Sequence, residues 1–348
     1  MTLFAASLRR VVTVSVATAA LSFSSFGAIA QALTLNGAGA SFPKPLYDRY
    51  FSEYKDQTGT QVNYEAIGSG GGIKQFIADT VDFAGSDAPP KDSEIEKMGK
   101  GLLMVPTAGG AVAVTYNLPG VSNLKLSRET LPAIFMGEIT RWNDAKIAQD
   151  NPGVNLPNRP IRVAVRSDGS GTTYIFTRHL SAISPEFDSQ VGANKAPSWP
   201  GNTVGGAKNA GVAAVVQQNE GAIGYVQADY AVENDLKTAA VENKAGDFVQ
   251  PTLDNANKAL EGVEFNPDFT TKNAQDPGSG YPIVGVTWLL IKKEYDNPEA
   301  AAAIKNMVQW ILTDGQDINS ELQYTKIPNS VAQKAIASIN NGVTVAGR

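Results

Sequence analysis

One pattern occurs three times in this chain: a strand-like segment leads through a turn rich in small residues into a helix-like segment. The three turns are residues 37–43, 68–72 and 166–172. Chains in which strands alternate with helices in this way bury a sheet against helices and form α/β domains. The pattern therefore predicts an α/β fold with the three turns at strand-to-helix junctions.

The spacing of apolar residues predicts the individual elements. Leu46, Tyr50 and Tyr54 recur every four positions, which indicates a helix that ends near Gly59. The segment 283–291 is almost entirely apolar, as expected of a strand buried on both faces. By the same reasoning we expect strands at 62–66, 82–87, 161–165 and 221–226, helices at 73–77, 172–180 and 298–312, and surface loops at 201–206 and 275–280.

The composition excludes several classes of function. The chain has 348 residues, which suggests two domains, and it contains no cysteine for disulfides, thiolate metal sites or nucleophiles. His179 is its only histidine, so a site with several histidine ligands cannot form. A formal net charge of −5 argues against a broad basic face for nucleic acid. We therefore expect no metal, no cofactor and no nucleic-acid partner.

Residues 1–30 are typical of a cleaved secretory signal peptide. Arg9 and Arg10 precede an uncharged and largely apolar stretch, and small residues around Ala30 and Ala32 fit two cleavage positions. A membrane anchor is the alternative, but serine, threonine and alanine dilute the stretch and a cleavage motif ends it. No cysteine is present to carry a lipoprotein anchor. We expect a periplasmic protein whose net charge changes from −5 to −7, because the leader contains two arginines and no acid.

A turn that leads from a strand into a helix suits an anion. The first N–H groups of a helix lack partners, and the helix dipole places about +0.5 charge there. Glycine lets the backbone approach a ligand closely. Three such ends and the charge of Arg166 would supply about +2.5, comparable to the ~−1.5 to −2 of a phosphoryl group even with one carboxylate nearby. The three turns together predict a site for a tetrahedral oxyanion.

The known nucleotide and hydrolase fingerprints are missing from these turns. No turn completes G-x-G-x-x-G, because Phe42 and Ile73 occupy the last position, and no G-K-[ST] sequence occurs. No G-x-S-x-G surrounds Ser69 or Ser170. A single turn of this kind is more often only a turn. The prediction therefore depends on the presence of three in one chain.

Two carboxylates lie close to the turns. Asp168 is inside the third turn, and Asp87 ends the short strand that begins at Asp82. A protonated phosphate oxygen can donate a hydrogen bond to a carboxylate, whereas sulfate has no proton to donate. A site built to bind a proton of its ligand can reject analogues without it by ~10⁴–10⁵. Asp87 could therefore favour phosphate over sulfate, although each residue could instead serve only a turn or a helix cap.

Four segments closely resemble the PstS-type phosphate-binding proteins of bacterial phosphate ABC transporters. They are GAGASFP at 37–43, GSGGG at 68–72, VDFAGSD at 81–87 and RSDGSGT at 166–172, and further similar segments lie at 137–143 and 221–226. The order and spacing also match, over essentially the whole mature chain. The resemblance implies a two-lobe α/β periplasmic binding protein (type II-like) with a cleft between its domains. Lobe 1 would comprise 33–113 and 285–348, lobe 2 would comprise 114–284, and crossing strands near 107–117 and 281–290 would join them.

The resemblance also implies the phosphate ligands, residue by residue. In lobe 1 they would be Ser41, the backbone N–H of Phe42, Ser69, and Asp87 as the acceptor of the phosphate proton. In lobe 2 they would be Arg166, Ser170, Gly171 and Thr172, with Asp168 orienting Arg166. Ser41 stands where close relatives can have threonine, and Gly70 stands where relatives can have a second serine.

Two kinds of function follow from these observations. The resemblance implies a receptor, monomeric when free, that closes on phosphate by hinge motion and delivers it to permease subunits driven by a cytoplasmic ATPase. The same receptor tuned to sulfate or another oxyanion is one alternative. The other is an exported phosphate-ester hydrolase with Ser69 or Ser170 as nucleophile, for which His179 is the only histidine base. We expect no enzyme, and we expect His179 and the four tryptophans to pack rather than bind a ligand.

Overall fold

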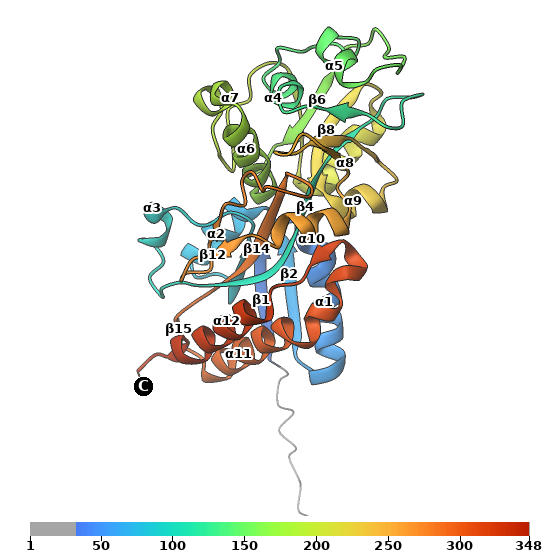
Figure 1. Ribbon diagram of the computed structural model, residues 1–348. Coiled ribbons are helices and arrows are strands. Elements are labelled where there is room, and N and C mark those ends of the chain that lie inside the picture. Colours follow the sequence, from blue (N-terminus) through green and yellow to red (C-terminus); the bar gives the residue numbers. More distant parts are fainter. Residues whose placement is uncertain (1–32, 348) are drawn as a thin grey trace, which may run out of the picture. The chain divides into compact units, whose positions relative to one another are not determined.

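The long strand β4 (Leu103–Tyr116) joins two groups of strands in the computed structural model, which describes residues 33–347 (Figure 1). The ten-stranded sheet has the order β2-β1-β3-β14-β4-β8-β6-β7, and β16 and β9 also pair with β4. The other strands of this sheet are β1 (Thr34–Gly39), β2 (Gln61–Ala66), β3 (Phe83–Ser86), β6 (Arg162–Arg166), β7 (Thr203–Gly206), β8 (Ala222–Gln227), β9 (Lys237–Thr238), β14 (Val284–Ile291) and β16 (Tyr324–Thr325). The expected signal peptide at 1–30 lies outside the described residues.

Helices connect and cover these strands, which confirms the expected α/β class. They are α1 (Lys44–Thr58), α2 (Ser69–Ile77), α3 (Asp92–Ile95), α4 (Thr130–Phe135), α5 (Ala145–Asp150), α6 (Gly171–Ile183), α7 (Pro185–Gln190), α8 (Lys208–Gln218), α9 (Ala228–Glu233), α10 (Leu253–Leu260), α11 (Pro298–Leu312) and α12 (Asn329–Gly342). One small three-stranded sheet and two pairs of strands complete the described fold. The three-stranded sheet has the order β11 (Phe248–Val249), β10 (Ala240–Glu242), β5 (Lys125–Leu126), and the pairs are β12 (Glu264–Phe265) with β13 (Thr271–Lys272) and β15 (Glu294–Tyr295) with β17 (Thr344–Val345). None of the helices within residues 33–347 has the length and apolar character needed to cross a membrane.

The two groups of strands define two lobes. We use lobe 1 for the residues around β1, β2, β3 and β14, and lobe 2 for those around β6, β7 and β8. The C-terminal helices α11 and α12 lie side by side and contact β1 and β4, so the end of the chain returns to lobe 1 (Figure 1). The boundaries expected from the sequence, at 113/114 and 284/285, fall inside β4 and β14 and stay a prediction.

Strand direction brings the predicted turns together. β1 is parallel to β2 and β3, and Gly39 at its end is in register with Ala66 at the end of β2 and with Gly85 one residue before the end of β3. In lobe 2, β6 is parallel to β7, with Arg166 in register with Gly206. Because the carboxyl ends of parallel strands meet at one edge of a sheet, the segments that follow these strands are neighbours.

Several predicted elements are confirmed with small changes of boundary. The helix expected from Leu46 to Tyr54 is α1, and it ends at Gly59 in the left-handed conformation with φ 75°. The apolar run 283–291 is β14, and all its residues are buried. The second turn is shorter than expected, because Ser69 already begins α2 and the glycines that follow are helical. Gly72 must be glycine, since a Cβ there would lie 2.5 Å from the Cα of Gly39.

One expectation is wrong: residues 201–206 are not simply a surface loop. Thr203–Gly206 form β7, which pairs with β6 at the edge of the sheet. The strand is short, partly exposed and half glycine, so it lacks the alternation that identifies strands in a sequence. A Cβ on Gly206 would lie 2.5 Å from the backbone of Val212, so glycine is what allows α8 to approach.

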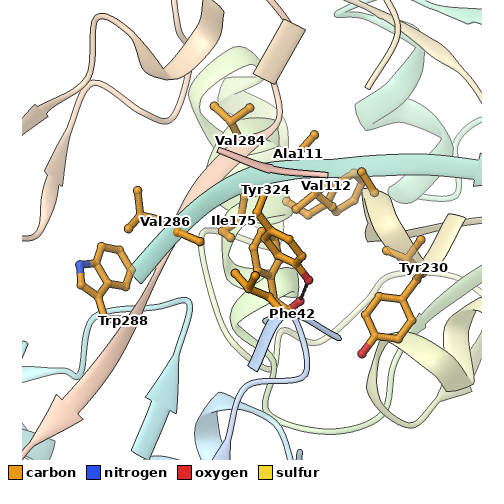
Figure 2. Packing of buried hydrophobic residues seen from close by; sticks show 14 of the residues in the cluster. Phe42, Ala111, Val112, Ile175, Tyr230, Val284, Val286, Trp288 and Tyr324 are labelled. Carbon is orange, nitrogen blue, oxygen red and sulfur yellow. Dashed lines mark hydrogen bonds between the residues drawn. The ribbon is translucent and has the colours of Figure 1, made fainter. Parts of the chain in front are cut away.

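Aromatic side chains anchor the first turn where β4 and β14 run together. Figure 2 shows the rings of Phe42 and Tyr324 among side chains of these two strands. The rings meet edge to face with centroids 5.9 Å apart, and the Tyr324 hydroxyl donates to the carbonyl of Phe42 at 2.5 Å. A Cβ on Gly110 of β4 would lie 3.1 Å from the Phe42 ring. This packing fixes the backbone of the first turn against the long strands.

The histidine and the tryptophans pack as expected. His179 is buried in α6 with Nδ1 2.8 Å from the carbonyl oxygen of Gln275, and burial lowers its pKa to about 4. Three of the tryptophans are buried, and Trp199 is partly buried against the core. Trp288, for example, donates its indole N–H to the carbonyl of Phe269 at 2.8 Å.

Candidate functional site

Lobe 1 contributes three polar side chains at the edge where β1, β2 and β3 end. Ser41 follows β1, Ser69 is the first residue of α2, and Asp87 follows β3. All three are almost fully shielded from solvent, with 0–2 % of their surface exposed. Ser69 and Asp87 are in direct contact, because the backbone N–H of Asp87 donates to the Ser69 hydroxyl at 3.2 Å.

Lobe 2 contributes the end of β6 and the first turn of α6. Ser170 caps α6 by accepting the backbone N–H of Thr173 at 3.0 Å. Gly171 and Thr172 form the first turn of the helix, where N–H groups have no partner inside the helix. Ser170 and Thr172 have no exposed surface.

Arg166, the last residue of β6, is held by Asp168. Its Nε and Nη2 donate to the two carboxylate oxygens of Asp168 at 2.8 and 2.5 Å, which is the two-pronged geometry that arginine forms with carboxylates. The backbone N–H of Lys208 donates to the same carboxylate at 2.9 Å. Burial tends to raise the pKa of Asp168, but the Arg166 contacts and this N–H outweigh it and hold the pKa below its usual value.

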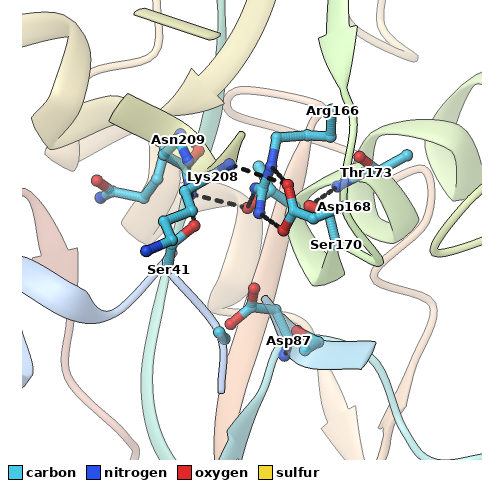
Figure 3. A network of polar contacts seen from close by, with 12 residues as sticks. Ser41, Asp87, Arg166, Asp168, Ser170, Thr173, Lys208 and Asn209 are labelled. Atoms are coloured by element: carbon cyan, nitrogen blue, oxygen red, sulfur yellow. Dashed lines mark hydrogen bonds and ion pairs between the residues drawn. The ribbon is translucent and has the colours of Figure 1, made fainter. Parts of the chain in front are cut away.

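The two lobes meet at these residues, as Figure 3 shows for Asp87 and Ser41 opposite Arg166 and Ser170. A Cβ on Gly171 would lie 2.5 Å from the Ser69 hydroxyl and 2.6 Å from Oδ2 of Asp87. Only glycine therefore allows the first turn of α6 to lie this close to lobe 1. Asp87 is also near enough to Arg166 for its charge to act on the pKa of the carboxyl.

Asp87 has one oxygen that is bonded and one that is not. The hydroxyl of Thr287 in β14 donates to Oδ1 at 2.8 Å, whereas Oδ2 has no hydrogen-bond partner among residues 33–347. Burial raises the pKa of Asp87 to about 7, against the opposing effects of Thr287, Arg166 and Ser69. An unpaired buried acceptor costs about 1–3 kcal/mol, and a ligand that donates a proton to Oδ2 would remove this cost.

The structure thus brings together the side chains expected to bind the anion from both lobes, but it changes the charge balance. The sequence argument allowed one carboxylate near the site, whereas both Asp87 and Asp168 lie in the cluster with Arg166. Their formal charges sum to −1 when Asp87 is ionised. A dianion would therefore be held mainly by neutral hydroxyl and N–H donors and by helix dipoles, and only weakly by net positive charge.

Gly70 contributes through its backbone. Its N–H donates to the carbonyl of Gly169 at 2.8 Å, which ties the second turn to the third. A Cβ at this position would lie 3.2 Å from the Cα of Gly169, closer than ordinary contacts. A serine at position 70 would therefore require the Asp168–Gly169 turn to shift.

Two residues of the cluster were not anticipated. Asn209, the second residue of α8, bonds to both Ser41 and Thr172, and Thr287 bonds to Asp87. The pair Gly205-Gly206 before α8 is a fourth strand–glycine–helix junction, and its recognition would have pointed to Asn209. Thr287 is the only hydroxyl residue in the apolar strand β14, which was the available signal for it.

The cluster lacks a histidine that could act as the base of a serine hydrolase. His179 is bonded to Gln275 in the body of lobe 2 and does not contact Ser69 or Ser170. Ser170 accepts a backbone N–H as a helix cap. Within residues 33–347, no three or more acidic or histidine side chains are grouped so that they could hold a metal ion.

Comparison with known proteins identifies close relatives. The model of a PBP superfamily domain matches residues 25–315. Phosphate-binding protein PstS of Pasteurella multocida is 40% identical over 320 residues, which are 90% of this chain and 92% of the relative. Phosphate-binding protein PstS of Haemophilus influenzae is 40% identical over 310 residues, 87% of this chain and 91% of the relative.

Solved structures confirm the two-lobe α/β fold. The high-affinity periplasmic phosphate-binding protein PfluDING, solved with bound phosphate, matches with a TM-score of 0.75 at 23% identity, covering 88% of this chain and 94% of that one. A putative phosphate ABC transporter substrate-binding protein from Clostridium perfringens matches with a TM-score of 0.63 at 20% identity, covering 85% and 100%. At these identities the likeness concerns the fold.

Proposed function

Because the chain belongs to the PstS-type phosphate-binding proteins of the PBP superfamily, we propose that it captures inorganic phosphate between its two lobes for import by an ABC transporter. The observation that carries the proposal is the buried Oδ2 of Asp87, which has no hydrogen-bond partner among residues 33–347 and lies with Ser69 against Gly171 of the other lobe. The relatives are binding proteins and not enzymes, and the hydrolase alternative finds no support in the geometry around Ser69 and Ser170.

We propose the following roles at the site. The hydroxyls of Ser41, Ser69, Ser170 and Thr172, the N–H groups of Phe42 and Gly171, and the guanidinium of Arg166 donate to the phosphate oxygens. Oδ2 of Asp87 accepts the proton that remains on phosphate. Asp168 holds Arg166 in a fixed orientation through its two hydrogen bonds. Sulfate would meet the same donors but would bring no proton to Oδ2, and this mismatch would exclude it.

Burial of the site requires the lobes to move. Ser41, Ser69, Asp87, Ser170 and Thr172 have 0–2 % exposed surface, so phosphate can reach them only when the lobes separate. β4 takes part in the strand pairing of both lobes, and β14 runs beside it. We propose that these two strands act as the hinge, with phosphate stabilising the closed form.

The family and the sequence support proposals for the remaining parts of the function. We propose that residues 1–30 direct export to the periplasm and are removed there. Phosphate would then pass from the closed protein to membrane permease subunits that are powered by a cytoplasmic ATPase. We propose that the free protein is a monomer, since both halves of the site lie in one chain.

Equilibrium binding tests the proposal. The mature chain is partly unfolded to remove bound ligand, refolded, and titrated with phosphate at neutral pH with and without excess sulfate. We expect one tight phosphate site per chain that sulfate does not occupy. A preference for sulfate, or release of phosphate from an ester with no binding of free phosphate, would contradict it.

A further inference from the structure

We infer that Asn209 is a positioning residue that makes Ser41 and Thr172 act only as hydrogen-bond donors toward the ligand. The inference rests on the proposed function and concerns a residue that lies behind the ligand-binding side chains. Asn209 is fully buried at the start of α8. It bonds to residues of both lobes, namely Ser41 in the turn 37–43 of lobe 1 and Thr172 in α6 of lobe 2.

The orientation of the Asn209 side-chain amide is fixed by its carbonyl. The oxygen Oδ1 accepts the backbone N–H of Gln227 at 3.0 Å, and a backbone N–H can only donate. The NH₂ group must therefore point the other way, toward the two hydroxyls. Nδ2 lies 3.0 Å from Oγ of Ser41 and 3.1 Å from Oγ1 of Thr172.

Both acceptor positions of each hydroxyl are then occupied. A hydroxyl group can accept two hydrogen bonds and donate one. Oγ of Ser41 accepts from the backbone N–H of Asn209 at 3.1 Å and from its Nδ2. Oγ1 of Thr172 accepts from Nδ2 of Asn209 and from Nη1 of Arg166 at 3.4 Å. Each hydroxyl can therefore only donate its hydrogen to a further group.

The consequence is a cluster with a defined hydrogen-bond polarity. Neither hydroxyl donates to another protein group among residues 33–347, so both hydrogens are available to a ligand oxygen. In the same cluster, Oδ2 of Asp87 is an acceptor that has no hydrogen-bond partner in the described part of the chain. The site therefore complements an anion that presents several unprotonated oxygens and one O–H, and Asn209 creates part of this complementarity without touching the ligand.

The test is a set of double-mutant cycles measured by calorimetric titration of ligand-free protein with inorganic phosphate. Asn209→Ala is made in the parent, in Ser41→Ala and in Thr172→Val. We expect Asn209→Ala to weaken phosphate binding by ~10- to 100-fold in the parent and by clearly less in either background, because part of what Asn209 orients is already gone. The ³¹P resonance of bound phosphate should also move in Asn209→Ala.

A matched control and a second variant make the test decisive. Asn219 ends the same helix, where its Nδ2 donates to the carbonyl of Val215 at 2.8 Å, so Asn219→Ala should leave phosphate affinity and the ³¹P shift unchanged. If the alanine variant folds poorly, Asn209→Asp keeps an oxygen for Gln227 and should weaken binding further, since a carboxylate would accept the two hydroxyl hydrogens.

The outcomes separate this inference from the proposed function. An equal cost of Asn209→Ala in all three backgrounds, or parent-like affinity of the variant, would overturn the positioning role while phosphate capture stands. Failure of the parent chain to bind phosphate would instead contradict the proposed function.

Discussion

Thr287 of β14 donates a 2.8 Å hydrogen bond to Oδ1 of Asp87 and so gives the two oxygens of this carboxylate different surroundings. Oδ2 has no partner within the described residues 33–347 and lies against the first helical turn of α6 in the other lobe. Thr287 is on one of the two strands proposed as the hinge, so the proposed acceptor for the phosphate proton is held by the element about which the lobes would move.

Removal of the Thr287 hydroxyl should weaken phosphate binding. In Thr287→Val, Asp87 loses a bond that lowers its pKa, so a smaller fraction of the carboxyl is ionised and able to accept a proton at neutral pH. A hydrogen bond to a charged group is worth about 1.5–3 kcal/mol, and we expect at least ~10-fold lower affinity in calorimetry. Thr287→Ser keeps the hydroxyl and should bind like the parent. Equal losses in both variants would show that packing, and not this bond, matters at position 287.

The ligand-free protein should lose stability as the pH rises toward neutrality. The pKa of Asp87 is raised to about 7 by burial, above its value in the unfolded chain, so the folded state holds this proton more tightly. The stabilisation is complete below the unfolded pKa of ~3.9 and is lost as the pH rises through ~7, by a few kcal/mol at most.

Urea unfolding of ligand-free parent and Asp87→Asn at several pH values measures this effect. The asparagine variant carries no charge at position 87, so its free energy of unfolding should fall less steeply over this interval. Identical slopes for the two proteins would show that Asp87 titrates at its ordinary pKa.

Arg166 should be needed for phosphate binding, and its loss should be more damaging while the Asp168 carboxylate is present. Arg166→Ala removes the only guanidinium in the cluster and leaves the Asp168 carboxylate unpaired, so phosphate affinity should fall by ~10²-fold or more. Arg166→Lys cannot restore the two-pronged contact and should recover little of the loss. A double variant that combines Arg166→Ala with Asp168→Ala no longer contains the unpaired charge, so part of the affinity for phosphate should return. Phosphate titrations of the three variants decide this, and parent-like binding by Arg166→Ala would exclude the site.

An ion pair between the lobes should slow phosphate release. Lys195 Nζ in lobe 2 lies 2.8 and 3.0 Å from the carboxylate oxygens of Glu94 in α3 of lobe 1, and its backbone carbonyl accepts the N–H of Ser170. Glu94→Gln should speed release several-fold, since a partly buried pair of this kind contributes about 1 kcal/mol. Stopped-flow release measures the rate, with the exposed Glu96→Gln as control. An unchanged rate in Glu94→Gln would mean that this pair does not hold the closed form.

The sequence was sufficient for the elements with strong periodicity and for the three turns that the structure places close together. The helical stripe through Leu46, Tyr50 and Tyr54 and the apolar strand β14 were predicted correctly, because each pattern follows directly from the burial of its own residues. The three turns could be singled out because strand-to-helix turns have a recognisable composition, and the family resemblance implied which of their residues would bind the ligand.

The features that could not be predicted from the sequence depend on contacts between distant segments. β7 is too short and too rich in glycine to show a period, so its pairing with β6 became visible only in the structure. Asn209 bonds to a serine 168 positions away and Thr287 to a carboxylate 200 positions away, and neither separation leaves a local pattern. The charge balance of the cluster likewise depends on both Asp87 and Asp168 lying beside Arg166.

The phosphate-over-sulfate affinity ratio of Asp87→Asn, compared with that of the parent by calorimetry at neutral pH, tests the central claim most directly. Asparagine keeps the shape of the side chain but presents an amide in place of a carboxylate acceptor. If Oδ2 of Asp87 accepts the phosphate proton, the ratio should fall by at least ~10²-fold, with sulfate binding gained. An unchanged ratio in a variant that unfolds like the parent would contradict the account.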